Sequence, residues 1–318
     1  MALLEVENLS IGYHSQKGYL HAVEDISFSL KAGKSLGFVG ESGCGKTTLG
    51  MALMGLLPPN GVIREGRILF EGKDLLKKSD EEMRKIRWKK ISMIFQAAMN
   101  ALNPVHRVED QIAEAILAHN PVYSEEEAMK KVEDLFMLVG IAKDRMRDYP
   151  HQYSGGMKQR AIIAMALACL PTLIIADEPT TALDVIVQDQ ILKEIKILQE
   201  KFKISLIFIS HDISVVSDVC DDIGVMYAGQ LVEYGDRLEV FSSPVHPYTK
   251  ALFSSYPTVT GEKYKLEPIA GEPPNLINQT LGCRFCHRCP SAGVSCKTQS
   301  PVWLELTPTH KAFCSIIR

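Results

Sequence analysis

Nine consecutive residues combine glycines with a lysine and two threonines in a pattern that can bind phosphate. They are Gly40-Glu41-Ser42-Gly43-Cys44-Gly45-Lys46-Thr47-Thr48. The glycines let backbone N–H groups turn toward an anion, and the N-terminus of a following helix adds partial positive charge. Lys46 is placed to reach the β- and γ-phosphates of a nucleotide, and the Thr47 hydroxyl to bind Mg²⁺. We therefore predict a nucleotide-phosphate loop, with contacts from Gly40, Ser42, Gly43, Cys44, Gly45, Lys46, Thr47 and Thr48.

Two adjacent carboxylates follow an apolar run at residues 173–176. Asp177, at the end of this expected strand, can hold Mg²⁺ through its water shell. Glu178 is then placed to accept a proton from an attacking water. With the phosphate loop, this pair predicts hydrolysis of a nucleoside triphosphate.

The expected elements fit these positions. An apolar strand at 36–39 precedes the loop, and a helical pattern begins near Lys46. Strands at 173–176 and 205–210 flank a helix whose apolar face carries Val187, Ile191, Ile195 and Leu198, which predicts a parallel sheet. Period-two alternation at 4–9 and 26–30 predicts further strands. Ser124 and Glu127 predict a capping box at the start of a helix in a mostly helical insert.

The composition is that of a soluble globular chain, with 46% hydrophobic and 23% charged residues in 318. A net charge of −3 does not favour binding to nucleic acid through bulk electrostatics. No leader and no membrane-spanning run is expected, so that a membrane role would require attachment to other chains.

The run Tyr153-Ser154-Gly155-Gly156-Met157-Lys158-Gln159-Arg160 resembles the signature of the ATP-binding cassette (ABC) family. In that family two nucleotide-binding subunits stack head to tail, and the signature of one closes over the γ-phosphate held by the other. The resemblance implies this role for Ser154, Gly155, Gly156 and Gln159. A hydroxyl and backbone N–H groups at a helix start make a plausible anion clamp. Tyr153 departs from the leucine that is commonest at its position.

Further matches follow the order of the family's motifs. Gln96 corresponds to the glutamine loop, which senses Mg²⁺ and contacts the membrane partner; the resemblance thus makes Thr47, Gln96 and Asp177 the Mg²⁺ residues. Asp184, in Ala182-Leu183-Asp184, corresponds to the D-loop at the subunit interface. His211 matches the switch histidine that contacts the γ-phosphate. Tyr13 matches the aromatic residue that stacks on adenine, although Tyr19 is a competitor and an ordinary core tyrosine is the alternative.

Three segments resemble the dipeptide/oligopeptide importer group within this family. They are 96–104, 227–233 and 244–252, and the tail from Gly282 through Arg288 to Cys314 completes the pattern. The group takes up peptides, and some members take up nickel chelates or oligosaccharides, so those cargoes are the alternatives. A soluble ABC ATPase is less expected because the chain has neither tandem cassettes nor a long coiled-coil insert. A non-hydrolysing cassette would lack Glu178 or His211.

Five cysteines crowd the last 36 residues: Cys283, Cys286, Cys289, Cys296 and Cys314. The spacing C-x₂-C-x₂-C-P is typical of iron–sulfur ligands, with structural zinc or unliganded thiols as alternatives. The resemblance implies a [4Fe–4S] cluster on Cys283, Cys289, Cys296 and Cys314, and leaves Cys286 as an additional thiol. Such a cluster would be a structural staple.

The fold class expected from the resemblance is α/β, a P-loop NTPase (ABC ATPase) core with an antiparallel β subdomain, an inserted helical subdomain and a small Cys-rich C-terminal domain. The expected bounds are 1–96 and 154–240 for the core, 97–153 for the helical insert and 241–318 for the C-terminal extension. The expected protein hydrolyses ATP with Mg²⁺ and powers a peptide importer, peripherally on the cytoplasmic face of the cell membrane. Its partners would be a second, different ABC ATPase subunit, two membrane-spanning permease subunits and, indirectly, an extracytoplasmic binding protein.

Overall fold

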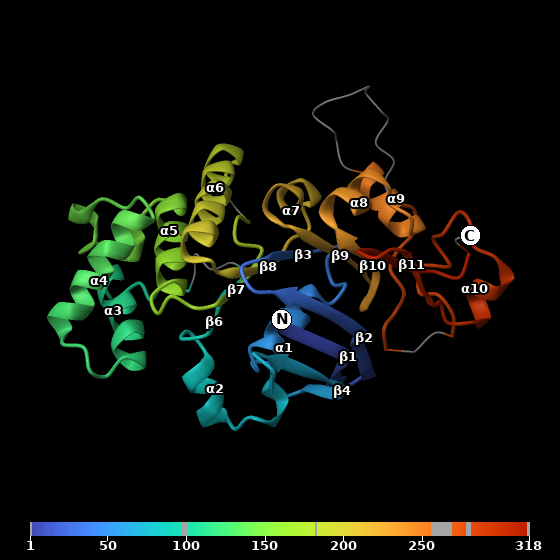
Figure 1. The fold of residues 1–318 in the computed structure, drawn as a ribbon, viewed down its shortest axis with the longest axis horizontal. Coiled ribbons are helices and arrows are strands. Elements are labelled where there is room, and N and C mark those ends of the chain that lie inside the picture. Colours follow the sequence, from blue (N-terminus) through green and yellow to red (C-terminus); the bar gives the residue numbers. More distant parts are fainter. Residues whose placement is uncertain (1, 97–100, 182, 256–268, 278–280, 317–318) are drawn as a thin grey trace. The chain divides into compact units, whose positions relative to one another are not determined.

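The computed structural model describes residues 2–96, 101–181, 183–255, 269–277 and 281–316 (Figure 1). These residues form two compact units. The first, which we call unit 1, contains residues 31–34 and 77–208. Unit 2 contains residues 2–30, 35–76 and 209–318, so the N-terminal strands and the Cys-rich C-terminal segment belong to one unit. The three-part division expected from the sequence stays a prediction.

Unit 2 contains a four-stranded sheet in the order β2-β1-β4-β5. The strands are β1 (Ala2–Ser15), β2 (Gly18–Lys31), β4 (Gly61–Phe70) and β5 (Lys73–Asp74). Strand β1 pairs antiparallel with β4, with Leu4 opposite Phe70 and Val6 opposite Ile68. Leu4, Val6, Ile68 and Phe70 are all buried, because alternate side chains of a strand point to the same face. This sheet confirms the antiparallel β portion.

A second group of strands in unit 2 is ordered β11-β12-β10-β9-β3. The strands are β3 (Ser35–Val39), β9 (Asp222–Tyr227), β10 (Gln230–Asp236), β11 (Trp303–Thr307) and β12 (His310–Phe313). Strand β3 is buried throughout and pairs parallel with β9, whereas β10, β12 and β11 add antiparallel pairs. The helices of this unit are α1 (Lys46–Leu53), α7 (Ile213–Val219), α8 (Arg237–Ser242), α9 (Pro247–Ser254) and α10 (Val294–Thr298), with a 3₁₀ turn at Leu75–Lys77 that runs to the boundary of unit 1.

Glu233 joins the C-terminal segment to this sheet. Its side chain is 0% exposed, and its carboxylate accepts hydrogen bonds from the backbone N–H groups of Val245 (2.8 Å) and His246 (2.9 Å). The ring of His310, on β12, lies 2.7 Å from the same carboxylate. Since a buried carboxylate is costly unless its oxygens are satisfied, these partners make Glu233 a specific anchor for residues far apart in the chain.

Unit 1 contains strands β6 (Ile91–Ile94), β7 (Leu173–Asp177) and β8 (Ser205–Ile209) in the order β8-β7-β6, and β6 is parallel to β7. Its helices are α2 (Asp80–Ile86), α3 (Val108–His119), α4 (Glu125–Leu138), α5 (Gly155–Ala166) and α6 (Val185–Phe202), with 3₁₀ turns at Lys143–Arg145 and Pro150–Gln152. Helices α3, α4 and α5 pack together (Figure 1). The expected capping box of α4 is confirmed, because the Ser124 hydroxyl accepts from the Glu127 N–H and the Glu127 carboxylate from the Ser124 N–H.

Candidate nucleotide-hydrolysis site

The glycine-rich loop in unit 2 connects the buried strand β3 to helix α1. Gly40, Gly43 and Gly45 all have positive φ, at 152°, 79° and 104°. A Cβ atom at Gly40 would overlap the carbonyl oxygen of Met226, and one at Gly45 that of Ala22. Glycine is therefore required at these two positions by backbone conformation and by space.

Lys46 is the first residue of α1 and is 6% exposed. Its ammonium group donates to the carbonyl oxygens of Gly40 (2.7 Å) and Glu41 (3.0 Å). The lysine side chain thus reaches across the loop from the start of helix α1. The backbone N–H groups of the first turn of a helix lie at this same end. The neighbouring Thr47 is exposed, so its hydroxyl is accessible beside the loop.

Tyr13 and Tyr19 differ in their surroundings. The Tyr13 hydroxyl donates to the Thr48 hydroxyl (3.0 Å), which places this ring next to the phosphate loop. Tyr19 instead packs edge-on against His14 and His21, with ring centroids 5.3 and 5.0 Å apart. Burial raises the pKa of the Tyr19 phenol. Of the two candidates, Tyr13 is the one in contact with the loop.

The carboxylate pair lies at the end of β7 in unit 1. Asp177 is 1% exposed, and Glu178 follows with φ at 48°. The Glu178 carboxylate accepts hydrogen bonds from the Gln96 amide (3.2 Å) and the Thr181 hydroxyl (3.0 Å). The structure therefore brings together Gln96 and Glu178, which are 82 residues apart in the chain.

The expected signature residues lie at the start of α5. The Ser154 hydroxyl caps the helix by accepting from the Met157 N–H (3.3 Å), and Ser154 and Gly155 are exposed. Tyr153 is buried, and its hydroxyl donates to the Arg145 carbonyl (2.9 Å). A tyrosine suits this position because its ring is buried and its hydroxyl bonds to the 3₁₀ turn at Lys143–Arg145. Gln159 is 2% exposed, so it packs inside unit 1.

The remaining expected residues are found at element boundaries. Asp184 caps α6 by accepting from the Val187 N–H (3.0 Å). His211 is exposed and follows β8, with Ser210 between the strand and the histidine. Ala182 of the expected D-loop and residues 97–100 after the expected glutamine loop lie outside the described residues.

All five C-terminal cysteines line one small pocket in unit 2. The other lining residues are His246, Pro247, Phe285, Ser315 and Ile316. Burial raises the pKa of the Cys283 thiol to about 11, helped slightly by the nearby thiols of Cys314, Cys286 and Cys296. Within the described ranges, no three His, Cys, Asp or Glu side chains converge closely enough to hold a single metal ion.

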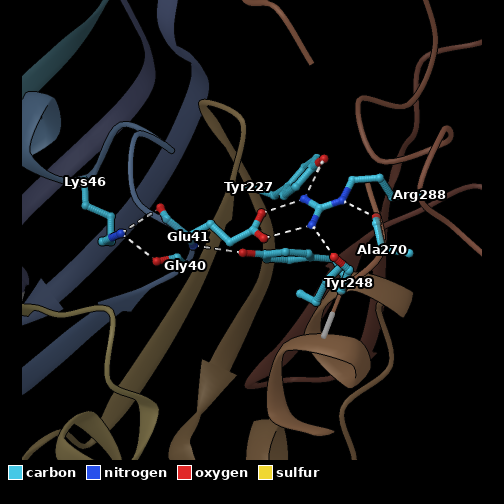
Figure 2. A network of polar contacts seen from close by, with 8 residues as sticks. Gly40, Glu41, Lys46, Tyr227, Tyr248, Ala270 and Arg288 are labelled. Carbon is cyan, nitrogen blue, oxygen red and sulfur yellow. Dashed lines mark hydrogen bonds and ion pairs between the residues drawn. The ribbon is translucent and has the colours of Figure 1, made fainter. Parts of the chain in front are cut away.

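The sequence did not indicate that Glu41 would have partners from the C-terminal segment (Figure 2). Arg288 donates to both carboxylate oxygens of Glu41, at 2.6 and 2.9 Å, and the Tyr248 hydroxyl accepts from the Glu41 N–H (3.0 Å). Both partners lie in segments that resemble the peptide importer group. That resemblance was the one hint in the sequence that these segments matter. Sequence spacing alone could not show that Arg288 and Tyr248 contact the phosphate loop.

The loop between β3 and α1, the acidic end of β7 and the capped start of α5 together define a P-loop ATPase. The family model "ABC transporter" matches residues 23–181, and the model "Oligopeptide/dipeptide transporter, C-terminal region" matches residues 232–296. The chain belongs to the ABC transporter family, as an ATPase whose activity is coupled to transport.

Relatives match the chain along nearly its whole length. The dipeptide transport ATP-binding protein DppD of Bacillus subtilis is 47% identical over 98% of this chain and 94% of that protein. The oligopeptide transport ATP-binding protein OppD of Escherichia coli is 45% identical over 98% of this chain and 93% of that protein.

Solved structures match the cassette fold. The ATP-binding cassette MJ0796, bound to ADP and Pi in a dimeric post-hydrolysis state, superposes with a TM-score of 0.66 at 26% identity, over 74% of this chain and 98% of that one. The structure of cbiO1 from Clostridium perfringens superposes with a TM-score of 0.66 at 31% identity, over 76% of this chain and 91% of that one. The ABC ATPase fold expected from the sequence is thus confirmed. In the part of the chain that the structure describes, no helix has the length and apolar character needed to cross a bilayer.

Proposed function

We propose that this chain hydrolyses ATP to power the uptake of peptides by an ABC importer. The observation that carries the proposal is the combination of an intact hydrolytic motif set with a C-terminal region of the oligopeptide/dipeptide kind. Dipeptide and oligopeptide transport ATP-binding proteins, each more than 40% identical to the chain, support peptides as the cargo. Oligosaccharides and nickel chelates are the alternative cargoes.

The proposed mechanism divides the work among the motif residues. The phosphate loop and Lys46 hold the phosphates, and Tyr13, beside Thr48, stacks on the adenine. Glu178 accepts the proton of the attacking water, and the amide of Gln96 and the hydroxyl of Thr181 fix the orientation of its carboxylate. His211 stabilises charge on the γ-phosphate.

Mg²⁺ fits the oxygen donors that these segments offer. A threonine hydroxyl, a carboxylate and an amide oxygen, from Thr47, Asp177 and Gln96, are the hard ligands that Mg²⁺ prefers. When bound, Mg²⁺ would neutralise charge on the β- and γ-phosphates. Ser154 and Gly155, exposed at the start of α5, would contact the nucleotide of a second cassette, with Gly156 and Gln159 shaping the same turn and Asp184 at the interface.

The proposed assembly contains a second, different ABC ATPase subunit and two permease subunits, with an extracytoplasmic binding protein acting indirectly. The chain would then be peripheral, on the cytoplasmic face of the cell membrane. Closure of the two cassettes on ATP would reshape the permease subunits. Purification from detergent-solubilised membranes is expected to recover this chain with the other three. Recovery with an identical second cassette would overturn the heteromeric pairing.

Transport in reconstituted vesicles tests the cargo. With the permease subunits, the second cassette and the binding protein present, dipeptides or oligopeptides are expected to accumulate in an ATP-dependent manner. They should also stimulate phosphate release. Stimulation by a nickel chelate or an oligosaccharide, with none by peptides, would replace the peptide assignment but keep the ATPase role.

A [4Fe–4S] cluster on Cys283, Cys289, Cys296 and Cys314 is the metal proposal for the C-terminal pocket. These thiols line one pocket, and among the described residues its other walls carry no Asp, Glu, Lys or Arg side chain. Cys₄ is the usual ligand set of such clusters. Cluster ligands bind different irons, so they need not converge on one point as zinc ligands must. Zinc is accordingly the weaker alternative, and Cys286 is the additional thiol.

Anaerobic purification tests this metal proposal. Iron near four atoms per chain and absorbance near 400 nm are the expected results, and Cys289→Ser should lower both. Cys169→Ser is the matched control, because Cys169 belongs to unit 1 and is not one of the thiols that line the pocket. Stoichiometric zinc without iron, or an absence of both metals, would overturn the cluster.

A further inference from the structure

The phosphate loop is contacted by residues of the segments that resemble the peptide importer group. Glu41 lies one residue after Gly40 in the loop, and each of its polar groups has a partner (Figure 2). Its carbonyl oxygen accepts from Lys46 (3.0 Å), its N–H donates to the Tyr248 hydroxyl (3.0 Å), and its carboxylate accepts from Arg288. A residue held at all three groups has little freedom to move.

The contact with Arg288 is a two-point interaction. Nη1 lies 2.6 Å from one carboxylate oxygen of Glu41, and Nη2 lies 2.9 Å from the other. Paired N–H···O bonds of this kind fix orientation as well as distance. The Arg288 side chain is only 4% exposed, so solvent screens the interaction weakly. Glu41 in turn raises the pKa of Arg288 above its ordinary range.

Arg288 is itself held in place from several directions. Its Nε donates to the carbonyl oxygen of Ala270 (2.9 Å) and its Nη2 to that of Ile269 (3.2 Å). Its guanidinium lies 5.7 Å from the centre of the Tyr227 ring. Along the chain it stands between Cys286 and Cys289, two of the thiols that line the C-terminal pocket. The position of Arg288 is therefore determined by the Cys-rich segment and its neighbours.

A third contact reaches the loop from the turn between β9 and β10. The N–H of Gly229 donates to the carbonyl oxygen of Cys44 (2.9 Å). Arg284 donates to the carbonyl oxygen of the preceding Ala228, so the same Cys-rich segment also supports this turn. The loop thus has outside contacts at Glu41 and at Cys44.

We propose that Arg288 is a positioning residue for ATP binding, which couples the Cys-rich segment to the phosphate loop through Glu41. This inference rests on the proposed role of the loop in nucleotide binding. Because Arg288 and Tyr248 order the loop before ATP arrives, less conformational entropy is lost on binding. Loss of either contact should lower the affinity for ATP and leave the hydrolytic step intact, since neither side chain touches the reacting atoms.

The test compares Arg288→Gln, Glu41→Gln and the double variant in the full chain. Dissociation constants for a fluorescent ATP analogue, and KM and kcat of the assembled transporter, are measured. Each single variant is expected to raise the dissociation constant and KM about fivefold or more, with kcat nearly unchanged. The double variant should be no weaker than either single one, because both remove the same interaction. Arg288→Lys should recover part of the affinity by restoring one donor and the charge.

Glu239→Gln is the matched control. Glu239, on helix α8 and outside the phosphate loop, also holds the C-terminal segment, by accepting from the hydroxyls of Thr307 (2.9 Å) and Thr309 (2.6 Å). The Glu239→Gln variant is expected to bind ATP with the same affinity as the unmodified chain. A similar loss of affinity in Glu239→Gln would show that any loosening of the C-terminal segment suffices, and would overturn the specific role of Arg288.

The remaining outcomes also decide the matter. If Arg288→Gln fails to fold, Glu41→Gln breaks the same pair without altering the Cys-rich segment, and unchanged affinity in that variant would overturn the inference. Additive losses of ATP affinity in the double variant would also overturn the inference. If the unmodified chain itself does not bind ATP, the proposed function fails instead, so that the two failures are distinguishable.

Discussion

Glu178 has a backbone conformation that few glutamates adopt, with φ at 48° directly after a buried strand. A positive φ in a residue with a Cβ costs free energy, and it persists where surrounding contacts require it. Here those contacts are the hydrogen bonds from Gln96 and Thr181 to the Glu178 carboxylate. The two hydrogen bonds hold the carboxylate in one orientation, which suits the general-base role proposed for it.

Glu178→Gln is expected to reduce ATP hydrolysis by about 100-fold or more, because a carboxamide cannot accept the proton from water. The substitution preserves size and lets the side-chain oxygen still accept from Thr181. ATP binding should therefore persist, and ATP should be trapped on the protein. Phosphate release and retention of radiolabelled ATP are the measurements. Hydrolysis at the unmodified rate would refute the role of Glu178.

Tyr13 is expected to contribute an aromatic face to ATP binding. Tyr13→Ala should weaken binding about tenfold, since base–aromatic stacking contributes about 1–3 kcal/mol. Tyr13→Phe is the matched control, because it keeps the ring and loses only the hydrogen bond to Thr48. Equilibrium binding of ATP by both variants gives the comparison. Equal losses in the two would mean that the hydroxyl, and not stacking, is what matters.

At the scale of elements, helix α5 depends on the turns before it. Tyr153 precedes the capping residue Ser154 and bonds back to Arg145 in the 3₁₀ turn at Lys143–Arg145. Farther along the helix, Arg160 donates to the carbonyl oxygen of Val139 and pairs with Glu194 on α6. The position of the signature at the helix start is thus determined by contacts on both sides of it.

Tyr153→Phe is expected to destabilise the chain by about 1 kcal/mol, since it leaves the Arg145 carbonyl without that donor but keeps the buried ring. Tyr153→Ala should cost about 3–5 kcal/mol through the cavity it creates. Urea unfolding of the two variants measures both effects. A loss in Tyr153→Phe as large as that in Tyr153→Ala would contradict the division between ring and hydroxyl.

At the scale of the whole molecule, the local elements followed from the sequence. The loop between β3 and α1, the strand before Asp177 and the capping box of α4 were all predicted and are confirmed. Each depends on residues close together in the chain, whose periodicity and cap chemistry fix a single local conformation. The buried face of α6 at Ile191, Ile195 and Leu198 follows the same rule.

Contacts between distant residues could not be predicted in this way. Glu41 and Arg288 are 247 residues apart, and the alternation of strand β12 does not reveal that it pairs with β10. Such pairings depend on how separate segments pack, which periodicity does not encode. The φ of Glu178 is similarly set by its neighbours in space. The pattern of motifs therefore supplies candidate residues for the site but not the contacts that orient them.

Glu233→Ala tests the anchoring of the C-terminal segment. The substitution leaves two backbone N–H groups and the ring of His310 without their acceptor, so unfolding should become easier by about 3 kcal/mol or more. Denaturant titration gives the free energy, and hydrogen exchange at β12 should increase most. Glu239→Ala, at a half-buried position, is the control. Equal stability of the two variants would contradict a special role for Glu233.

The distance along the chain between Glu41 and Arg288 also has a temporal meaning. Ribosomes add about 5–20 residues each second, so the partner of Glu41 emerges about 12–50 s after the loop itself. During that interval the nascent polypeptide carries a complete glycine-rich loop that lacks its guanidinium partner. High affinity for ATP would accordingly arise only after Arg288 has been translated, so that chains terminated before Arg288 would compete poorly for nucleotide.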